Sequence, residues 1–393
     1  MREVLRQFRD FFVSLQLTVV LLALGIILIF WATLAQTDLG VWGVQQKFFH
    51  SFFVLEHIPG TEVPAPVFPG GYFIGGLLFV NLIAAHVYRF RYSRRQIGIW
   101  LTHVGLMLLL LGELLSGLWQ QDFQMSFKEG ETKNYSESFR DNELAIIDST
   151  DPKVDQVVAI PEAILARGET VQNPKLPFRV VPKAYYPNAD ARLRSDVAGA
   201  PPSPATVGNF AQQVVLLPMP VTYKEDERNL PGAYVELIGP DGSLGTFLLS
   251  ADLPMPQHFS YGGRSYKIIL RVARHYEPYS LQLLKITNDI FPGSDIPKNF
   301  ASRVRLQSED GHDNREVVIY MNNPLRYHGL TYYQYQMDKN SGTSVLQVVN
   351  NPSWRLPYVA CGMMALGLVI QFGLHLAAFA RRRSAPARRA VSP

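Results

Sequence analysis

The amino-acid sequence predicts a membrane α+β protein, in which four transmembrane helices carry one large β-rich extracytoplasmic domain between the third and fourth helices. Four apolar runs are each long enough, at about 1.5 Å per residue, to cross roughly 30 Å of hydrocarbon. Residues 120–353 instead contain repeated alternation of apolar and polar residues, which predicts strands of a sandwich or barrel-like domain. Arginines gather at the margins of the apolar runs and indicate which ends face the cytoplasm.

The first apolar run extends from Phe12 to about Leu34 and follows three arginines, Arg2, Arg6 and Arg9. A run of about 23 residues is longer than the core of a signal peptide, so we expect an uncleaved span with a cytoplasmic amino terminus. Residues 36–71 are then an outer loop, with an aromatic segment in the membrane interface and a Pro/Gly-rich tether. Within this loop, the seven-residue spacing of His50 and His57 is only weak support for a metal site.

The second and third runs, Tyr72 to about Tyr88 and Ile97 to Trp119, form a hairpin that completes the helical segment 1–119. The turn at 89–96 joins them and contains no acidic residue. This turn is predicted to face the cytoplasm because it holds four arginines: Arg89, Arg91, Arg94 and Arg95.

Two histidines in this hairpin are predicted to lie at the same depth. His86 is eight residues before Arg94 and His103 is eight residues after Arg95, so both imidazoles lie roughly 12 Å or less from the cytoplasmic edge. Ionisable side chains within membrane spans often mark a cofactor or a pathway, which makes the pair candidate metal ligands. The alternative is that each imidazole only hydrogen-bonds a neighbouring helix.

The last segment, residues 354–393, contains the fourth apolar run, from Leu356 to Ala380, and a basic tail that begins at Arg381. By the same charge rule this tail is cytoplasmic, so both termini lie on one side, as four crossings require. His375 lies roughly 9 Å from that margin, which places a third membrane histidine toward the same leaflet.

Composition excludes several classes of function. The net charge of +4 gives no support for nucleic-acid binding, because the arginines are concentrated at the membrane margins. The single cysteine, Cys361, allows neither an internal disulfide nor a CxxC motif. Thiol exchange within this chain and a soluble zinc site are therefore not expected.

Three motifs accompany this layout: LTHVGLMLLLLGELLSG in the third run, QMSFKEGET directly after it, and MNNPLRYHGLTYYQYQ shortly before the fourth. In their order and spacing the chain resembles the ResB/CcsB family of system II cytochrome c biogenesis proteins. The resemblance implies a multi-pass protein of the bacterial cytoplasmic membrane that takes part in haem transfer and in its delivery to apocytochrome c. It also implies two protein partners, a ResC/CcsA-like membrane protein and a thiol-reducing thioredoxin-like protein.

The resemblance implies that His103, near the start of the third span, is the haem-ligating histidine, with haem b as a transient cargo. His86 and then His375 rank below it, and the second axial ligand is expected from the partner. Because the five tryptophans are scattered, the family's tryptophan-rich segment must be on that partner, together with the thioether-forming step.

Arg94 and Arg95 are candidate partners for the haem propionates, although each arginine alone is more simply explained as a topology signal. No residue of this chain is expected to be catalytic. Two other functions stay open: a b-type membrane cytochrome with two histidine ligands, and a non-catalytic membrane-anchored assembly module.

Overall fold

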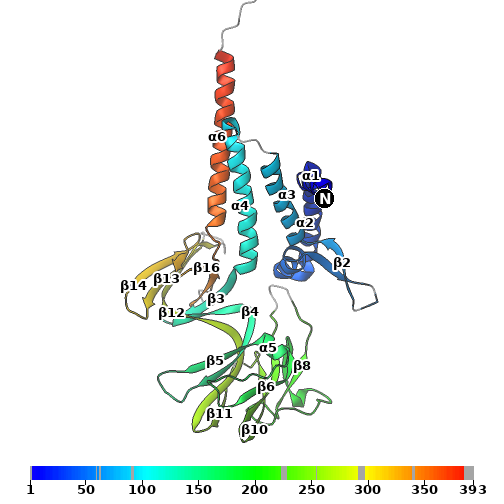
Figure 1. Ribbon diagram of the computed structural model, residues 1–393. Helices are drawn as coiled ribbons and strands as arrows, with labels where there is room; N and C mark the ends of the chain where they lie inside the picture. Colours follow the sequence, from blue (N-terminus) through cyan, green and yellow to red (C-terminus); the bar gives the residue numbers. More distant parts are fainter. Residues whose placement is uncertain are drawn as a thin grey trace, which may run out of the picture. The chain divides into compact units, whose positions relative to one another are not determined.

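The computed structural model describes residues 2–58, 60, 61, 63–89, 93–222, 228–253, 255–290, 297–338 and 341–384. The chain divides into two compact units: a helical unit up to Gln120 and from Asn351 onward, and a β-rich unit from Gln121 to Asn350 (Figure 1). The predicted fold class is confirmed, because the β-rich unit is inserted between the third and fourth long apolar helices.

The helical unit contains four described helices that are long and apolar enough to cross a membrane, together with a short amino-terminal helix and a small hairpin. Its elements are α1 (Arg2–Phe12), α2 (Leu15–Val44), the π-helical turn η1 (Gln45–Phe49), β1 (Phe53–His57), β2 (Pro64–Pro69), α3 (Gly71–Tyr88), η2 (Arg94–Gln96), α4 (Ile97–Trp119) and α6 (Leu356–Ser384).

The break between α1 and α2 is held by α3. Carbonyl groups at such a break have lost their helical donors and need others, because water is scarce in an apolar layer. The buried amide of Asn81, 2% exposed, donates to Phe12 O at 2.7 Å and to Ser14 O at 3.1 Å. The Arg89 guanidinium donates to Val13 O at 3.2 Å. One polar face of α3 therefore fixes the entry of the chain into α2.

Residues 36–71 differ from the loop expected from the sequence. Helix α2 continues well past Leu34. Residues 35–44 contain no proline, which is the residue that would most strongly end the helix. Gly40, with φ of 67°, produces a kink instead of an end. The segment expected to be a Pro/Gly-rich tether forms the antiparallel pair β1–β2, in which prolines occupy the edge strand β2.

Helices α4 and α6 lie side by side because three glycines on α4 allow their backbones to approach (Figure 1). A Cβ at Gly98 would lie 2.5 Å from the carbonyl oxygen of Gly367, and one at Gly105 would lie 2.9 Å from that of Ala360. A Cβ at Gly112 would meet Leu356 at 3.2 Å. Such close contacts replace the hydrophobic driving force that is missing between helices in lipid.

The β-rich unit contains a nearly closed barrel, here called the barrel lobe. Its sheet runs in the order β14-β13-β12-β4-β3-β17-β16-β15, and Ser302 of β13 hydrogen-bonds Gln334 of β16 at 2.6 Å across the barrel. The strands are β3 (Gln121–Lys128), β4 (Thr132–Asp148), β12 (Arg264–Ile290), β13 (Pro297–Ser308), β14 (Asn314–Tyr320), β15 (Leu325–Tyr327), β16 (Leu330–Asp338) and β17 (Thr343–Asn350).

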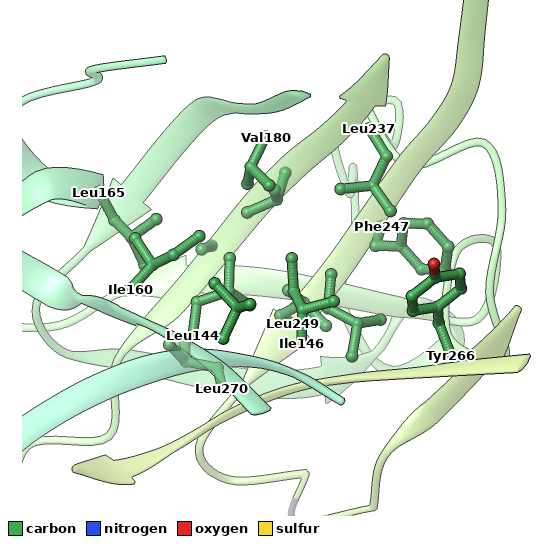
Figure 2. Packing of buried hydrophobic residues seen from close by; sticks show 14 of the residues in the cluster. Leu144, Ile146, Ile160, Leu165, Val180, Leu237, Phe247, Leu249, Tyr266 and Leu270 are labelled. Carbon is green, nitrogen blue, oxygen red and sulfur yellow. The ribbon is translucent and has the colours of Figure 1, made fainter. Parts of the chain in front are cut away.

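The second part, the sandwich lobe, packs the three-stranded sheet β10-β9-β6 against the outer halves of β4 and β12. Leu144 and Leu270 from one sheet point toward Val180 and Leu249 from the other (Figure 2). Its elements are β5 (Gln156–Pro161), α5 (Glu162–Ala166), β6 (Arg179–Tyr186), β7 (Ala189–Leu193), η3 (Arg194–Asp196), β8 (Val214–Pro218), β9 (Gly232–Gly239), β10 (Gly242–Ser250) and β11 (Gln257–Tyr261). The segment YVELIG-PDGS-LGTFLLS forms the hairpin β9–β10.

We expect Gly105→Ala to destabilise the helical unit, because the new Cβ would lie 2.7 Å from the Met364 side chain. Overpacking of this kind costs about 1–3 kcal/mol, which thermal unfolding of the full chain in detergent would detect as a lower midpoint. Gly25→Ala is the matched control, since nothing lies within 4 Å of its Cβ. Equal midpoints for the two variants would contradict the close α4–α6 contact.

Candidate functional site

The imidazoles of His86 and His103 meet between α3 and α4. Their ring centroids are 4.9 Å apart and their planes are inclined by 50°. Each ring is partly buried, and both come from helices that are long and apolar enough to span a membrane. The two rings share one depth, as the symmetrical spacing about the arginine-rich turn predicts.

Hydrogen bonds within each helix fix the tautomers of this pair. Nδ1 of His86 lies 2.9 Å from Leu82 O, and Nδ1 of His103 lies 2.8 Å from Ile99 O. Because a carbonyl oxygen only accepts, each Nδ1 must carry a proton, and a ring in its neutral form then has its lone pair on Nε2. Histidines that ligate metals typically donate Nδ1–H to a carbonyl in this way.

The spacing of the rings limits how they could bind one metal. Two trans axial imidazoles need ring centroids roughly 6 Å apart, because each metal–nitrogen bond is about 2 Å and the nitrogen is about 1 Å from its ring centre. At 4.9 Å the rings leave no room for a porphyrin plane between them. Among the described residues, no group of three His, Cys, Asp or Glu side chains has the proximity for a metal ion.

The arginines of the turn lie beyond this pair. Arg94 and Arg95 are exposed in η2, where the Ser93 hydroxyl accepts a bond from the Arg95 N–H at 3.4 Å. Arg89 is directed to the α1–α2 break, as described above. Arg91 lies outside the described residues, and so does the tail from residue 385. A role of Arg94 and Arg95 in ligand binding stays a prediction.

His375 is not brought to the His86–His103 pair. It is exposed on α6, with its Nε2 atom 2.9 Å from the amide nitrogen of Gln371. Gln371 packs at the level of Gly98 on the antiparallel α4, so His375 lies roughly 13 Å along the helix axes from His103. The apolar run was taken to end at Ala380, yet the helix continues to Ser384, and its register against α4 was not visible in sequence.

The glycine face of α4 determines which way His103 points. Because an α-helix turns by about 100° per residue, His103 lies on nearly the opposite side of α4 from Gly98 and Gly105. Its ring is thereby directed away from α6 and toward α3. The seven-residue spacing of the three glycines is a signal in the sequence that the reading from hydropathy missed. The buried Asn81 is a second such signal, a lone amide within an apolar run.

A separate polar cluster lies in the barrel lobe, where β12 bulges away from β4. Pairing with β4 is interrupted between Tyr276 and Leu281, and this bulge places the Glu277 carboxyl, 9% exposed, inside the protein. His275 Nε2 lies 3.0 Å from Glu277 Oε1, and its ring stacks on Phe123 at 5.4 Å. Burial raises the pKa of Glu277, and the nearby His275 and His328 partly oppose that rise.

Buried phenols extend this cluster across the barrel. Tyr279 and Tyr332 share a hydrogen bond of 2.7 Å between their hydroxyl oxygens, and burial raises the pKa of each. The turn between β15 and β16 places His328 over Tyr279, with centroids 5.5 Å apart. His328 and Gly329 both have positive φ, of 47° and 83°, as a two-residue I′ hairpin requires.

A cavity of about 300 Å³ is lined in part by Tyr279 and Ser280 of the same bulge. Its lining is mostly uncharged hydroxyl and amide groups: Thr132, Asn134, Tyr279, Ser280, Gln307, Ser308 and Glu309. Such a surface offers donors and acceptors but only one carboxylate. It lies at a different site from the histidine pair of the helices.

A part of the β-rich unit matches a known protein family. Residues 259–345, from β11 to β17, match the model of the ResB-like family. The rest of the chain lies outside this match. His275, Glu277 and His328 are among the matched residues, whereas His86 and His103 are not.

Two relatives were found among characterised sequences. Protein NrfI of Wolinella succinogenes is 29% identical over 92 residues, which is 23% of this chain and 10% of NrfI. The cytochrome c biogenesis protein CcsB of Crocosphaera subtropica is 29% identical over 116 residues, which is 30% of this chain and 25% of CcsB. The matched part of this chain therefore spans a quarter or less of each relative.

We expect Glu277→Gln to stabilise the barrel lobe more strongly as pH rises. A carboxyl whose folded pKa is raised favours the fold below its ordinary value of 4.5 and loses that contribution as it ionises at higher pH. Glutamine has no proton to lose and stays uncharged at every pH, so the difference in unfolding free energy between the variant and the parent should grow from acidic to neutral pH. Hydrogen exchange of β12 and β16 amides in the full chain measures it.

The exposed Glu316→Gln is the control for loss of a carboxylate on the same sheet. A Glu277→Gln variant that is less stable than the parent at neutral pH would mean that the ion pair with His275 outweighs the cost of burying the charge.

Proposed function

We propose that this chain is a membrane subunit of a system II cytochrome c synthase complex and that it handles haem on its way to apocytochrome c. The observation that carries the proposal is the pair of imidazoles that meet between α3 and α4, each with its Nδ1 atom held by a carbonyl of its own helix. The match of residues 259–345 to the ResB-like family model supports it, as does the name of the relative CcsB, a cytochrome c biogenesis protein. Haem is then a cargo that passes through the protein.

His103 is the residue to which we assign the iron. Its Nδ1–H is held by Ile99 O, so Nε2 is available as a nitrogen donor, and α4 is anchored against α6 by the glycine contacts. His86 is too close to occupy the opposite axial position. It is better suited to orient the His103 ring or to exchange with it as ligand. The second axial ligand then comes from a ResC/CcsA-like partner in the membrane.

The charged turn suggests where the propionates are directed. Arg95 is eight residues before His103, which is about 12 Å along α4, and a guanidinium can pair with a carboxylate in bidentate fashion. By the positive-inside rule this end of the hairpin faces the cytoplasm. Haem would thus enter from the cytoplasmic side with its carboxylates at the turn and its apolar ring between the helices.

The covalent step is assigned to the partner. Thioether formation needs reduced cysteines and a vinyl group held beside them, and this chain's only cysteine is Cys361, which lies on α6. Reduction of the apocytochrome is then the task of a thioredoxin-like protein. For the outer domain we propose a role in holding the apocytochrome, as an extended peptide next to an exposed strand edge.

The decisive measurement is the haem content of the complex purified with His103→Gly. We expect bound haem to fall about tenfold or more, and added imidazole to restore it by occupying the vacated position. His312→Gly, in an exposed loop of the outer domain, is the control. Unchanged haem in His103→Gly would remove this histidine from the site.

The rival functions give different outcomes in the same experiment. His86→Gly should keep haem while shifting its absorbance, whereas equal loss from both variants and stoichiometric haem in the isolated chain would indicate a b-type cytochrome. A complex that is colourless even with the partner present would indicate an assembly module that binds no haem.

A further inference from the structure

The cavity beside the β12 bulge is lined by outward-facing side chains of three neighbouring strands. Lys133 of β4 pairs with Leu281 of β12, and Leu281 pairs with Leu306 of β13. Leu281 and Leu306 are fully buried in the barrel, so the residues next to them in each strand point outward. The outward neighbours that line the cavity are Asn134, Ser280 and Gln307. They form one row across the three strands.

The interrupted pairing of β4 with β12 leaves a backbone position open beside this row. The ladder has the pairs Lys133–Leu281 and Tyr135–Tyr276, and no described residue of β12 pairs with Asn134 between them. Backbone N–H and C=O groups that lack a strand partner can bind the amide groups of another peptide. The bulge therefore adds backbone donors and acceptors to those of the side chains.

The lining of the cavity suits a ligand that contains amide groups. Asn134 and Gln307 end in carboxamides, which have the donor and acceptor of a peptide group, and Thr132 adds a hydroxyl. Tyr279 is only 2% exposed, so its ring offers no face on which a planar ligand could stack. Pockets for free small molecules are roughly 300–1,000 Å³ and mostly apolar. A polar cavity at the lower limit of that range suits one residue of a longer peptide.

The charge around the cavity favours a basic residue. Glu309 is the one charged residue of the described lining, and the adjoining turn between β13 and β14 adds Asp310 and Asp313. A hydrogen bond from the Ser308 hydroxyl lowers the pKa of Asp310, which is therefore ionised at neutral pH. Arg315 pairs with Asp313 at 3.2 Å. The carboxylates of Glu309 and Asp310 thus give this turn a negative charge that attracts cations.

We propose that this cavity holds a lysine of an extended peptide, with the ammonium group on Glu309 and the adjoining peptide groups on Asn134 and Gln307. The inference rests on the proposed function, in which the outer domain holds apocytochrome c, and it states where and by which residue type. A lysine ammonium has three donors, which the Glu309 carboxylate and neighbouring hydroxyl and carboxamide oxygens accept. Binding is non-covalent, and no proton is transferred.

The test measures how tightly the full-length chain in lipid nanodiscs binds a dye-labelled, haem-free cytochrome c with reduced cysteines, by fluorescence anisotropy. A second probe is the same polypeptide with acetylated lysines, which have lost their charge. Glu309→Gln should weaken binding of the unmodified probe about fivefold and leave binding of the acetylated probe unchanged. Glu316→Gln, on the neighbouring strand β14, is the matched control and should change neither. Equal affinity of the parent and Glu309→Gln for the unmodified probe would overturn the proposal.

A second variant fills the cavity and leaves its charge in place. Thr132→Trp, at an exposed lining position, should weaken binding of both probes about tenfold, whereas Ser260→Trp on the exposed face of β11 should weaken neither. Equal binding by the two tryptophan variants would also overturn the assignment. If His103→Gly keeps its haem, the proposed function fails. If it loses haem while Glu309→Gln and Thr132→Trp bind apocytochrome as the parent does, this inference fails alone.

Discussion

The contact between α4 and α6 is the constraint on which the arrangement of the helical unit depends. Lipid gives no hydrophobic reward for bringing two apolar helices together, so association requires surfaces that fit closely. Gly98, Gly105 and Gly112 supply that surface on one side of α4. The opposite side is thereby left for α3, and this is where His103 meets His86. The glycine contacts with α6 on one face of α4 thus determine that His103, on the opposite face, is directed toward α3.

Several polar side chains of the helical unit donate to backbone carbonyls, in two different arrangements. The imidazoles donate to carbonyls one turn earlier in their own helices. Asn81 and Arg89 instead donate to carbonyls that the α1–α2 break has exposed. The first arrangement holds the Nδ1 atom of each ring, and the second fixes the start of α2. The polar residues of the apolar helices thus fall into two groups: histidines that bond a carbonyl of their own helix, and residues of α3 that bond carbonyls at the α1–α2 break.

Sequence reasoning predicted the helices well because a membrane span is a local property: length and apolarity alone decide it. The meeting of His86 and His103 was also predictable, since a short turn fixes the pairing of a hairpin. The depth of His375 relative to His103 was not predictable, because α4 and α6 are separated in the sequence by the whole β-rich unit. Their register is set by the glycine contacts. The same limit applies to residues 36–71, where a kink at Gly40 replaced a helix end.

The sequence predicted that residues 120–353 form strands, but it did not predict which strands pair with one another. Alternation identifies a strand but carries no information about its neighbours. The sheet order therefore had to come from the structure, including the bulge that buries Glu277. Haem ligation by His103 and propionate binding by Arg94 and Arg95 stay predictions, since they concern a ligand that enters and leaves.

The barrel and sandwich lobes share two long strands, whose pairing shifts register between Val272 and Arg274 and again between Tyr276 and Leu281. Residues 142–148 of β4 and 266–272 of β12 pair in the sandwich lobe, while the remaining parts of both strands continue into the barrel sheet. At the crossing point the nearly buried ion pair of Glu143 and Arg271, at 2.9 Å, links the strands from side to side. Because β4 and β12 run through both lobes and this ion pair joins them, a displacement of one lobe is expected to displace the other with it.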